Sequence, residues 1–245
     1  HTTIEDNVVY DNKSNVYISD TQYCLFQRNV VYCTPGNSHD NTYQSNLGMQ
    51  DETQAQGASS NNTVINNLFL GGKANFIFFH NPALGSNGLK NVLMAHNTFV
   101  NARAFGNLWI DGQGSHSNSR IMNNVFLQED SLPQTVLGVI TGITFSYNNW
   151  SKPPSSTVSQ ANDVIGDPKL TKTGSTGPGQ LTPDWFKLLS NSPAISKAVV
   201  LSQVTDDFFK TIRPVGSGPD IGAHEYVSGS SDTTPPAAPT GLKVR

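Results

Sequence analysis

The sequence predicts an all-β chain wound as a parallel β-helix, and three observations support this prediction. A short motif recurs six times in the first 150 residues: an apolar residue, two variable residues, Asn, one variable residue and an apolar β-former. Successive motif Asn residues are 22, 38, 30, 27 and 24 residues apart, which is typical of a solenoid. The apolar runs are four to six residues long, too short for helices. The motif Asn residues are Asn7, Asn29, Asn67, Asn97, Asn124 and Asn148.

These Asn residues are predicted to form the corners between strands. A corner residue must tolerate a left-handed or bridge conformation while satisfying its own backbone, and Asn does both well. Stacked coils would place each Asn above the next, so that the amides hydrogen-bond along the axis as a ladder. The flanking apolar residues would stack inside as aliphatic and aromatic columns. His96 and Asn123, which precede two of the ladder residues, are predicted to be turn formers.

A second, weaker pattern predicts at least one more strand in each coil. Asn15, Asn75 and Asn107 each follow a ladder Asn by eight to ten residues and precede three largely apolar residues. We expect these segments to form a separate sheet. The alternative is a β-sandwich in which the Asn recurrences arise by chance.

Composition excludes some classes of function. Charged residues make up 13% of the chain and the formal net charge is −3, and the scattered Lys and Arg residues form no basic patch for nucleic acid. No stretch of 18 apolar residues is present, so the sequence predicts no membrane span. Because the chain begins directly at a coil motif, we expect either that further N-terminal coils precede it in the natural protein or that an N-terminal cap is supplied elsewhere.

The chain divides into three parts. Residues 1–150 are predicted to form the coils, with residues 34–61 as a long polar loop between sheets, the kind of segment that often carries function. Residues 151–227 are predicted to hold a C-terminal coil and a cap over the end of the solenoid, with a short helical turn beginning near Thr182. Residues 228–245 have the composition of a linker leading into a following domain.

The two cysteines test the predicted corner at Asn29. If two short strands meet there in an L-shape, the Cα atoms of Cys24 and Cys33 lie more than ~10 Å apart. A disulfide requires roughly 4.4–6.8 Å. We therefore predict two free, buried thiols, whereas a hairpin at this place would permit a disulfide.

The chain resembles a known family in two regions. The repeats of residues 1–150 resemble those of right-handed parallel β-helix, pectate-lyase-like proteins. The C-terminal runs 191–195, Arg213-Pro214 and 219–226, the last reading Pro-Asp-Ile-Gly-Ala-His-Glu-Tyr, resemble the end of secreted bacterial β-helix proteins that are often followed by anchoring modules. Residues 232–244 resemble the entry to a fibronectin type III domain.

This resemblance implies an extracellular or cell-surface protein, part of a longer multidomain chain, that acts on polysaccharide as a lyase or glycoside hydrolase. It also implies that Arg213 forms a structural ion pair with Asp220 or Glu225. A β-helix suits such a ligand because its flat sheets present parallel rows of side chains at intervals of ~4.8 Å.

The candidate catalytic residues are Asp20, His80 and Asp111. The first two lie five residues after the Asn of the second pattern and Asp111 lies four after it, so all three are expected near one edge of one sheet. Two carboxylates with a nearby His can supply acid and base for glycoside cleavage.

Substrate and metal contacts are predicted from residue type and position. Trp109 and His116 are candidate substrate-binding residues, and a lyase would use cations such as Lys73 and Arg103 to neutralise a uronate. In the polar loop, Asp40, Asp51 and Glu52 are candidate oxygen ligands for Ca²⁺. The alternative for each residue is a solvated turn position on the outer surface.

Two functional hypotheses follow. A polysaccharide-degrading enzyme predicts ionisable groups clustered beside exposed aromatic residues on one sheet. A non-catalytic module for glycan binding, adhesion or spacing predicts neutral rows of Asn, Ser, Thr and Gln.

Overall fold

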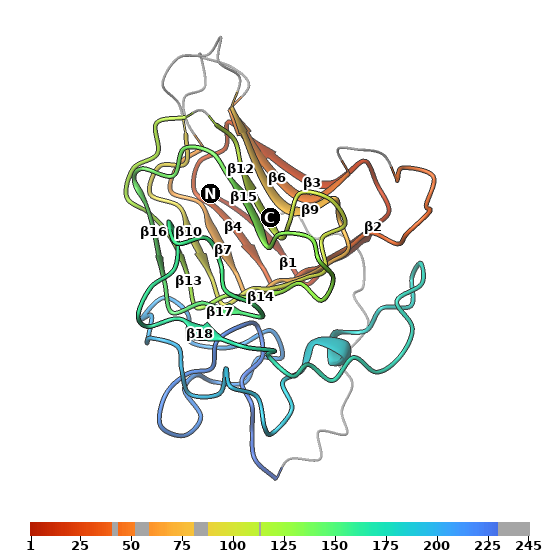
Figure 1. Cartoon of the computed structure of the whole chain (residues 1–245), viewed down its shortest axis with the longest axis vertical. Coiled ribbons are helices and arrows are strands. Elements are labelled where there is room, and N and C mark those ends of the chain that lie inside the picture. The colour runs from red at the N-terminus through yellow and green to blue at the C-terminus, as the bar shows by residue number, and fades with distance from the viewer. Residues whose placement is uncertain (41–43, 52–58, 81–87, 113, 230–245) are drawn as a thin grey trace.

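The computed structural model describes residues 1–40, 44–51, 59–80, 88–112 and 114–229, without the side chains of Asp51 and His80. The chain winds into a right-handed parallel β-helix in which each complete coil contributes one strand to each of three sheets (Figure 1). Strand neighbours within all three sheets pair in parallel. The predicted solenoid is confirmed, and the β-sandwich alternative is wrong because such sandwiches are built from antiparallel strands.

The strands are short and stack in coil order. Sheet A contains β1 (Thr2–Glu5), β4 (Cys24–Gln27), β7 (Thr63–Ile65), β10 (Leu93–Ala95), β13 (Ser119–Met122) and β16 (Ile143–Ser146). Sheet B contains β2 (Val8–Tyr10), β5 (Val30–Tyr32), β8 (Leu68–Leu70), β11 (Thr98–Val100), β14 (Val125–Leu127), β17 (Asn149–Trp150) and β18 (Val164–Ile165). Sheet C contains β3 (Ser14–Ser19), β6 (Ser45–Asp51), β9 (Ala74–His80), β12 (Leu108–Ile110) and β15 (Thr135–Leu137).

The predicted asparagine ladder lies at the corner between sheets A and B. From Asn7 to Asn124, each ladder Nδ2 donates to Oδ1 of the ladder Asn in the next coil, at 2.9–3.2 Å. The same oxygen accepts the backbone N–H of the preceding ladder residue. All six side chains are buried. The ladder is confirmed, and it satisfies buried polar groups that would otherwise destabilise the corner.

The left-handed residue at this corner is the one before each ladder Asn, which corrects the prediction that the ladder Asn itself takes this conformation. The six preceding residues have φ between 52° and 57°. The chain therefore reverses one position earlier, and the ladder Asn contributes its amide instead. His96 and Asn123 are turn formers as predicted. The left-handed residues are Asp6, Arg28, Asn66, His96, Asn123 and Tyr147.

The interior holds a column of stacked aromatic rings. The ring centroids of Phe69 and Phe99 are 4.7 Å apart and those of Phe99 and Phe126 are 5.1 Å apart, with nearly parallel planes. Trp150 continues the column at 4.3 Å from Phe126. These four side chains are fully buried, so the predicted aromatic column is present and fixes the stacking of the coils.

Both cysteines are free and buried, as predicted. Cys24 begins β4, and Cys33 follows β5 on the far side of the ladder corner at Asn29. Burial raises the pKa of the Cys33 thiol to about 12. The L-shaped corner therefore separates the two thiols, and each acts as a small core residue.

Part of the segment predicted as a loop is a strand. Within residues 34–61, β6 pairs with β3 on one side and with β9 on the other. Asn46 at its start extends a second buried ladder, in which Asn15 donates to Asn46 at 2.8 Å and Asn46 donates to Asn75 at 2.7 Å. The ladder continues where Nδ2 of Asn75 donates to Oδ1 of Asn107 at 2.6 Å. Strand β6 therefore makes sheet C continuous across the coils.

The C-terminal segment, residues 166–226, covers the outer face of sheet B. Leu181, Trp185 and Phe186 pack with outward side chains of sheet B such as Leu68 and Val125. Figure 1 shows this segment, in cyan and blue, running alongside β14, β17 and β18. Outward strand positions in sheet B are apolar, and this cover removes them from water. Within the predicted C-terminal coil and cap, residues 166–226 therefore form a lateral cover.

A short 3₁₀-helix lies in this cover. It spans Pro183–Phe186, with proline in its first turn as predicted, and buries Trp185 and Phe186. In the part of the chain that the structure covers, no helix has the length and apolar character required to cross a membrane.

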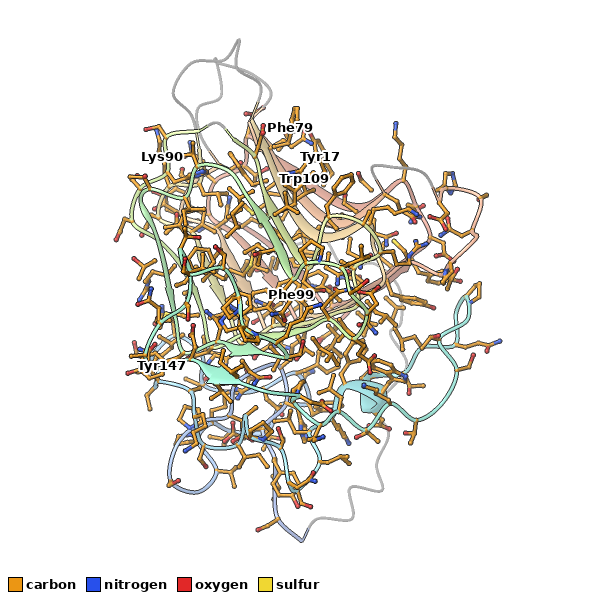
Figure 2. The ribbon with its side chains drawn as sticks, viewed as in Figure 1. Tyr17, Phe79, Lys90, Phe99, Trp109 and Tyr147 are labelled. Atoms are coloured by element: carbon orange, nitrogen blue, oxygen red, sulfur yellow. The ribbon has the colours of Figure 1, made fainter. Side chains whose placement is uncertain are left out.

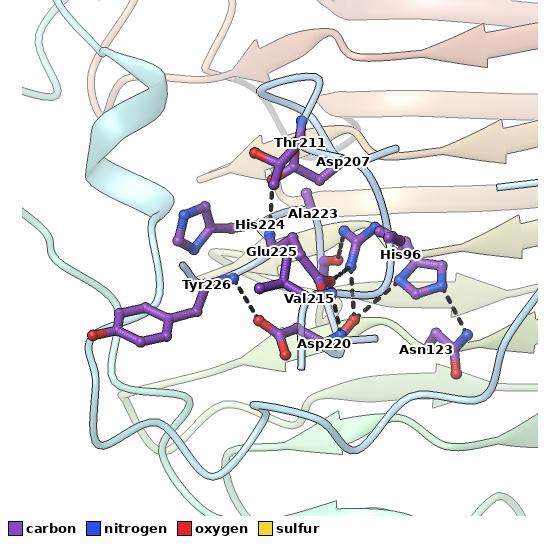
Figure 3. A network of polar contacts seen from close by, with 12 residues as sticks. His96, Asn123, Asp207, Thr211, Val215, Asp220, Ala223, His224, Glu225 and Tyr226 are labelled. Atoms are coloured by element: carbon purple, nitrogen blue, oxygen red, sulfur yellow. Dashed lines mark hydrogen bonds and ion pairs between the residues drawn. The ribbon is translucent and has the colours of Figure 1, made fainter. Parts of the chain in front are cut away.

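A buried polar network fixes the cover to the ladder corner (Figure 3). Arg213 forms an ion pair of 2.7 Å with Glu225, and both side chains are almost completely buried. Arg213 also donates to the carbonyl oxygens of Asp220 and Gly222 at 3.0 and 2.7 Å. The expected structural ion pair is thus found between Arg213 and Glu225, while the partner atom on Asp220 is its backbone carbonyl.

Candidate functional site

The outer face of sheet C carries exposed aromatic side chains, whereas the other outer faces are wholly or partly covered. The C-terminal segment packs over sheet B. Leu201 and Val204 of the same segment pack against outward residues of sheet A, among them Ile65 and Met122. On sheet C, Tyr17 and Phe79 are each 42% exposed. Figure 2 shows Tyr17, Phe79 and Trp109 near one another on this side of the molecule.

Strand alternation explains why aromatic residues line this face. In sheet C the flanking residues of each strand, such as Phe76 and Phe78 in β9, are fully buried in the core. The residue between them points outward, since successive strand side chains alternate. Register pairing then aligns these outward residues across the five strands as one row, here called the aromatic row: Tyr17, Gly48, Ile77, Trp109 and Val136.

Tyr17 is positioned by β6, the strand that pairs with its own strand β3. A Cβ atom built at Gly48 would lie 3.3 Å from Cδ2 of Tyr17, so the ring lies close against that glycine. The Tyr17 hydroxyl donates to Oε1 of Gln50 at 2.5 Å. The ring therefore lies across the neighbouring strand, and the side chain is partly exposed on the outer face of sheet C.

Trp109 is supported from the corner that precedes its strand. Its ring centroid lies 4.2 Å from that of Phe105, with planes inclined at 31°. The backbone N–H of Phe105 donates to the carbonyl oxygen of Lys73 at 2.7 Å, which holds the corner against the previous coil. The two rings form one enlarged apolar surface at the predicted substrate-binding residue Trp109.

A second outward row lies two residues further along each strand and mixes polar with aromatic groups. Ser19, Gln50 and Phe79 are aligned by register, and Asp111 follows β12 at the same level. The backbone N–H of Asp111 donates to the carbonyl oxygen of Phe78 at 3.0 Å, which extends the pairing to that residue. Hydrogen-bonding groups therefore stand directly beside the aromatic row.

The backbone brings the three predicted catalytic residues to one edge of sheet C. Asp20 directly follows the pair Ser19–Gln50, and Asp51 pairs with His80. Asp20, Asp51 and His80 therefore share one level, with Asp111 one residue before it. Asp20 and His80 are two strand spacings apart, roughly 10 Å between backbones. The side chain of His80 lies outside the described residues, so the catalytic roles remain predictions.

Lys73 and Arg103, predicted to bind substrate, are paired with the predicted metal ligand Asp40. Lys73 Nζ lies 2.8 Å from Oδ1 of Asp40, and Arg103 lies 2.6 Å from Oδ2. Arg103 also donates to Oε1 of Gln44 at 2.9 Å. Hydrogen bonds from Arg103 and then Lys73 hold the pKa of the Asp40 carboxyl well below its usual range. This cluster ties Asp40 and Gln44 to the coils.

The predicted Ca²⁺ site gains no support from Asp40, because both of its carboxylate oxygens face cations. The side chain of Asp51 and all of Glu52 lie outside the described residues. Among the residues that the structure does describe, no three His, Cys, Asp or Glu side chains gather as a metal-binding set.

His116, the remaining predicted substrate-binding residue, is buried. Its Nδ1 accepts the backbone N–H of Leu89 at 3.0 Å, and its ring packs edge-on against Phe78 at 5.0 Å. These contacts place His116 inside a corner of the solenoid, away from the outer face of sheet C.

Sequence reasoning missed Tyr17, Phe79, Phe105 and Gln50 as surface residues of this face. The signal for one of them was present: Tyr17, Ile77 and Trp109 each lie two residues after the Asn of the second pattern. Aligning the strands on that Asn would have shown one outward row. Gln50 was missed because its strand, β6, was predicted to be a loop. Phe105 was missed because it lies at the corner before β12, outside the strand pattern.

The chain matches no model of a known protein family, and none of the curated proteins compared with it is similar in sequence.

Proposed function

We propose that the outer face of sheet C binds an extended polysaccharide. The observation that carries this proposal is the aromatic row, in which Tyr17 and Trp109 stand in register on one flat sheet with Phe79 beside them. A pyranose ring presents a face of C–H groups that packs on an aromatic ring, and the coil spacing of ~4.8 Å is close to the length of one sugar unit. An extended chain can therefore place successive sugars along the coil axis.

Polar groups beside the row complement the sugar hydroxyls. Gln50 and Ser19 lie in the second outward row, and Asp111 stands at the same level. The Asp111 carboxylate accepts hydrogen bonds, and the Gln50 amide and Ser19 hydroxyl both donate and accept them, so these groups can orient a ligand on an apolar platform. The strands hold these groups rigidly, which lowers the entropy lost on binding.

The test is a binding panel of soluble polysaccharides with single Ala variants of Tyr17, Phe79 and Trp109. Each aromatic substitution is expected to weaken binding about three- to tenfold, the size of one ring contact. Tyr23→Ala is the matched control, because Tyr23 is 49% exposed but precedes β4 in sheet A. Wild-type protein that binds no polysaccharide, or Ala variants that bind as tightly as the control, would reject the proposal.

Cleavage of the bound chain is a second candidate function, favoured by the predicted catalytic residues at one edge of sheet C. The register places Asp20, Asp51 and His80 at one level beside the second row. Incubation with each bound polymer, followed by reducing-end and ultraviolet assays, separates hydrolysis from lyase chemistry. Loss of product formation in Asp20→Asn and Asp111→Asn with binding retained would support catalysis. Binding without any product would leave a non-catalytic module.

Extracellular location belongs to the same proposal. It is supported by the resemblance of residues 219–226 to the end of secreted bacterial β-helix proteins, and polysaccharides are abundant outside cells. Fractionation of the source organism with an antibody against this chain tests it directly.

A further inference from the structure

The spacing of the two rings in the aromatic row bears on the shape of the polysaccharide. Tyr17 belongs to β3, but its ring lies over Gly48 of β6, one strand further along the coil axis. The hydrogen bond from its hydroxyl to Gln50, also in β6, holds the ring at that place. Trp109 belongs to β12, and β9 lies between β6 and β12 in the sheet. The Tyr17 ring and the strand that carries Trp109 are therefore two strand spacings apart, or ~9.6 Å.

Ile77 of β9 fills the space between the two rings. It stands in the outward row, yet only 7% of it is exposed, because adjacent side chains cover it. Its Cγ2 atom lies 3.6 Å from the position of a Cβ atom at Gly48, the place over which the Tyr17 ring lies. Its register partner on the other side is Trp109, which is partly exposed. The row is thus one apolar surface with a ring at each end and a shorter aliphatic side chain between them.

This spacing suits alternate sugars of a straight chain. Each sugar advances about one strand spacing, ~4.8 Å, so a first sugar on Tyr17 places the third on Trp109. Sugars joined through equatorial bonds at C1 and C4 turn over at each link, and the first and third therefore present the same face of C–H groups. Chains with α-1,4 or β-1,3 links curve, so that their third sugar leaves the plane of a flat sheet.

We propose that the ligand of this face is a straight β-1,4-linked chain, such as a glucan, mannan or xylan of that linkage, and not a coiled α-1,4- or β-1,3-linked chain. This inference rests on the proposed polysaccharide-binding function. The strands fix the positions of the two rings, so a chain that already has the matching shape loses little conformational freedom on binding. A coiled chain must first straighten, which lowers its affinity and creates the selectivity.

The test measures the affinity of the whole chain for oligosaccharides of two to six sugars in three series, with β-1,4, α-1,4 and β-1,3 links. In the β-1,4 series, three sugars are expected to bind about three- to tenfold more tightly than two, the gain of one ring contact. The other two series are expected to lack this step, because their third sugar misses the second ring. Polymers of the same three linkages complete the panel.

Two variants assign the step to the pair of rings. Tyr17→Ala and Trp109→Ala are each expected to abolish the gain from two to three sugars, because one ring of the pair is missing. Tyr23→Ala is the matched control and should retain the gain, since Tyr23 is exposed but precedes β4 in sheet A. Circular dichroism verifies that each variant is folded.

The outcomes separate this inference from the proposed function. Equal steps in all three series, β-1,4 binding without the step, or tighter binding of a coiled glycan would overturn the inference and leave polysaccharide binding intact. Failure of every oligosaccharide and polymer to bind would overturn both. A step confined to the β-1,4 series, and lost in Tyr17→Ala and Trp109→Ala but not in the control, would establish both.

Discussion

The ring of Tyr17 lies against Gly48, the residue paired with it on the neighbouring strand of sheet C. A Cβ atom at Gly48 would be 3.3 Å from Cδ2 of Tyr17 and 3.6 Å from Cγ2 of Ile77. The φ angle of Gly48 is not positive, so the backbone at this position can carry any side chain. The glycine therefore provides space for the ring, and not a special turn.

Gly48→Val is expected to weaken polysaccharide binding about three- to tenfold by displacing the Tyr17 ring. The same change is expected to leave the melting temperature unchanged or higher, because glycine inside a strand is less stable than a β-branched residue. Calorimetric titration and thermal unfolding of the same samples measure the two effects. Gly48→Ala should fall between wild type and valine, and an unaltered affinity of the valine variant would show that Tyr17 takes no part in binding.

Asn97→Leu is expected to destabilise the protein by roughly 3–5 kcal/mol. Asn97 is fully buried and donates to Asn124 Oδ1 and to the carbonyl oxygens of Val64 and Ala95. Its own Oδ1 accepts from Asn67. Leucine fills similar volume but leaves these groups without partners, and urea unfolding measures the loss.

Asn12→Ala is the control for the ladder prediction. Asn12 is exposed and donates to the Tyr10 carbonyl oxygen and to Asn15, so its replacement should cost at most about 1 kcal/mol. Equal losses in the two variants would mean that the buried ladder contributes no more than a surface turn.

The ladder was predictable because its residues repeat at the same place in each coil. The same motif also contains the aromatic column, because Phe69, Phe99, Phe126 and Trp150 each lie two residues after a ladder Asn. Strand β6 was not predictable in the same way, because Ser45-Asn46-Leu47-Gly48-Met49 has one glycine at an outward position and lies in a polar segment. Glycine takes the place of an apolar residue at position 48 because the ring of Tyr17 lies where a side chain would be.

The repeat pattern could not predict side-chain contacts between segments that are far apart in the sequence. Asp40, Lys73 and Arg103 were assigned to a metal site and to substrate binding by residue type, yet they contact one another across coils. The C-terminal segment has apolar residues suited to covering an end or a side, and periodicity does not distinguish the two. Trp109 was named only as a candidate substrate-binding residue, and its role stays a prediction, although its alternation with Leu108 and Ile110 would have placed it on the outer face of sheet C.

Arg213→Met is expected to destabilise the C-terminal cover by roughly 3–5 kcal/mol, because it leaves Glu225 buried without its partner. Hydrogen exchange should rise across residues 166–226 more than across the coils, since the network joins the cover to the solenoid through His96 and Asp220. Lys210→Met is the control: Lys210 is largely exposed and lies 3.5 Å from Asp6. Its loss should change stability by at most about 0.5 kcal/mol, and a comparable effect of both variants would contradict a special role for Arg213.

The same network predicts that stability falls as pH rises from 4 to 6. Burial raises the pKa of Asp220 to about 6, despite hydrogen bonds from the N–H groups of Tyr226 and Ser196. In the unfolded chain an aspartate titrates near ~3.9. Below that value Asp220 is protonated in both states and its contribution to stability is complete. Between the two values only the unfolded chain ionises, so the contribution is lost as pH rises through about 6.

The expected loss is at most about 3 kcal/mol, from a difference of about two pKa units. Burial also raises the pKa of Asp207, which acts in the same direction. Asp40 has the opposite effect on the pH dependence of stability. Its pKa is lowered in the folded protein, so its contribution is complete above the pKa of the unfolded chain and is lost as pH falls below it. Urea unfolding at several pH values between 4 and 7 measures the slope. Asp220→Asn should flatten this decline of stability with pH, whereas the control Asp167→Asn should not. The pKa of Asp167 is lowered, because hydrogen bonds from Lys169 outweigh the effect of its partial burial. A wild-type stability that rises steadily from pH 4 to 6 would show that Asp220 is ionised at little cost in the folded protein.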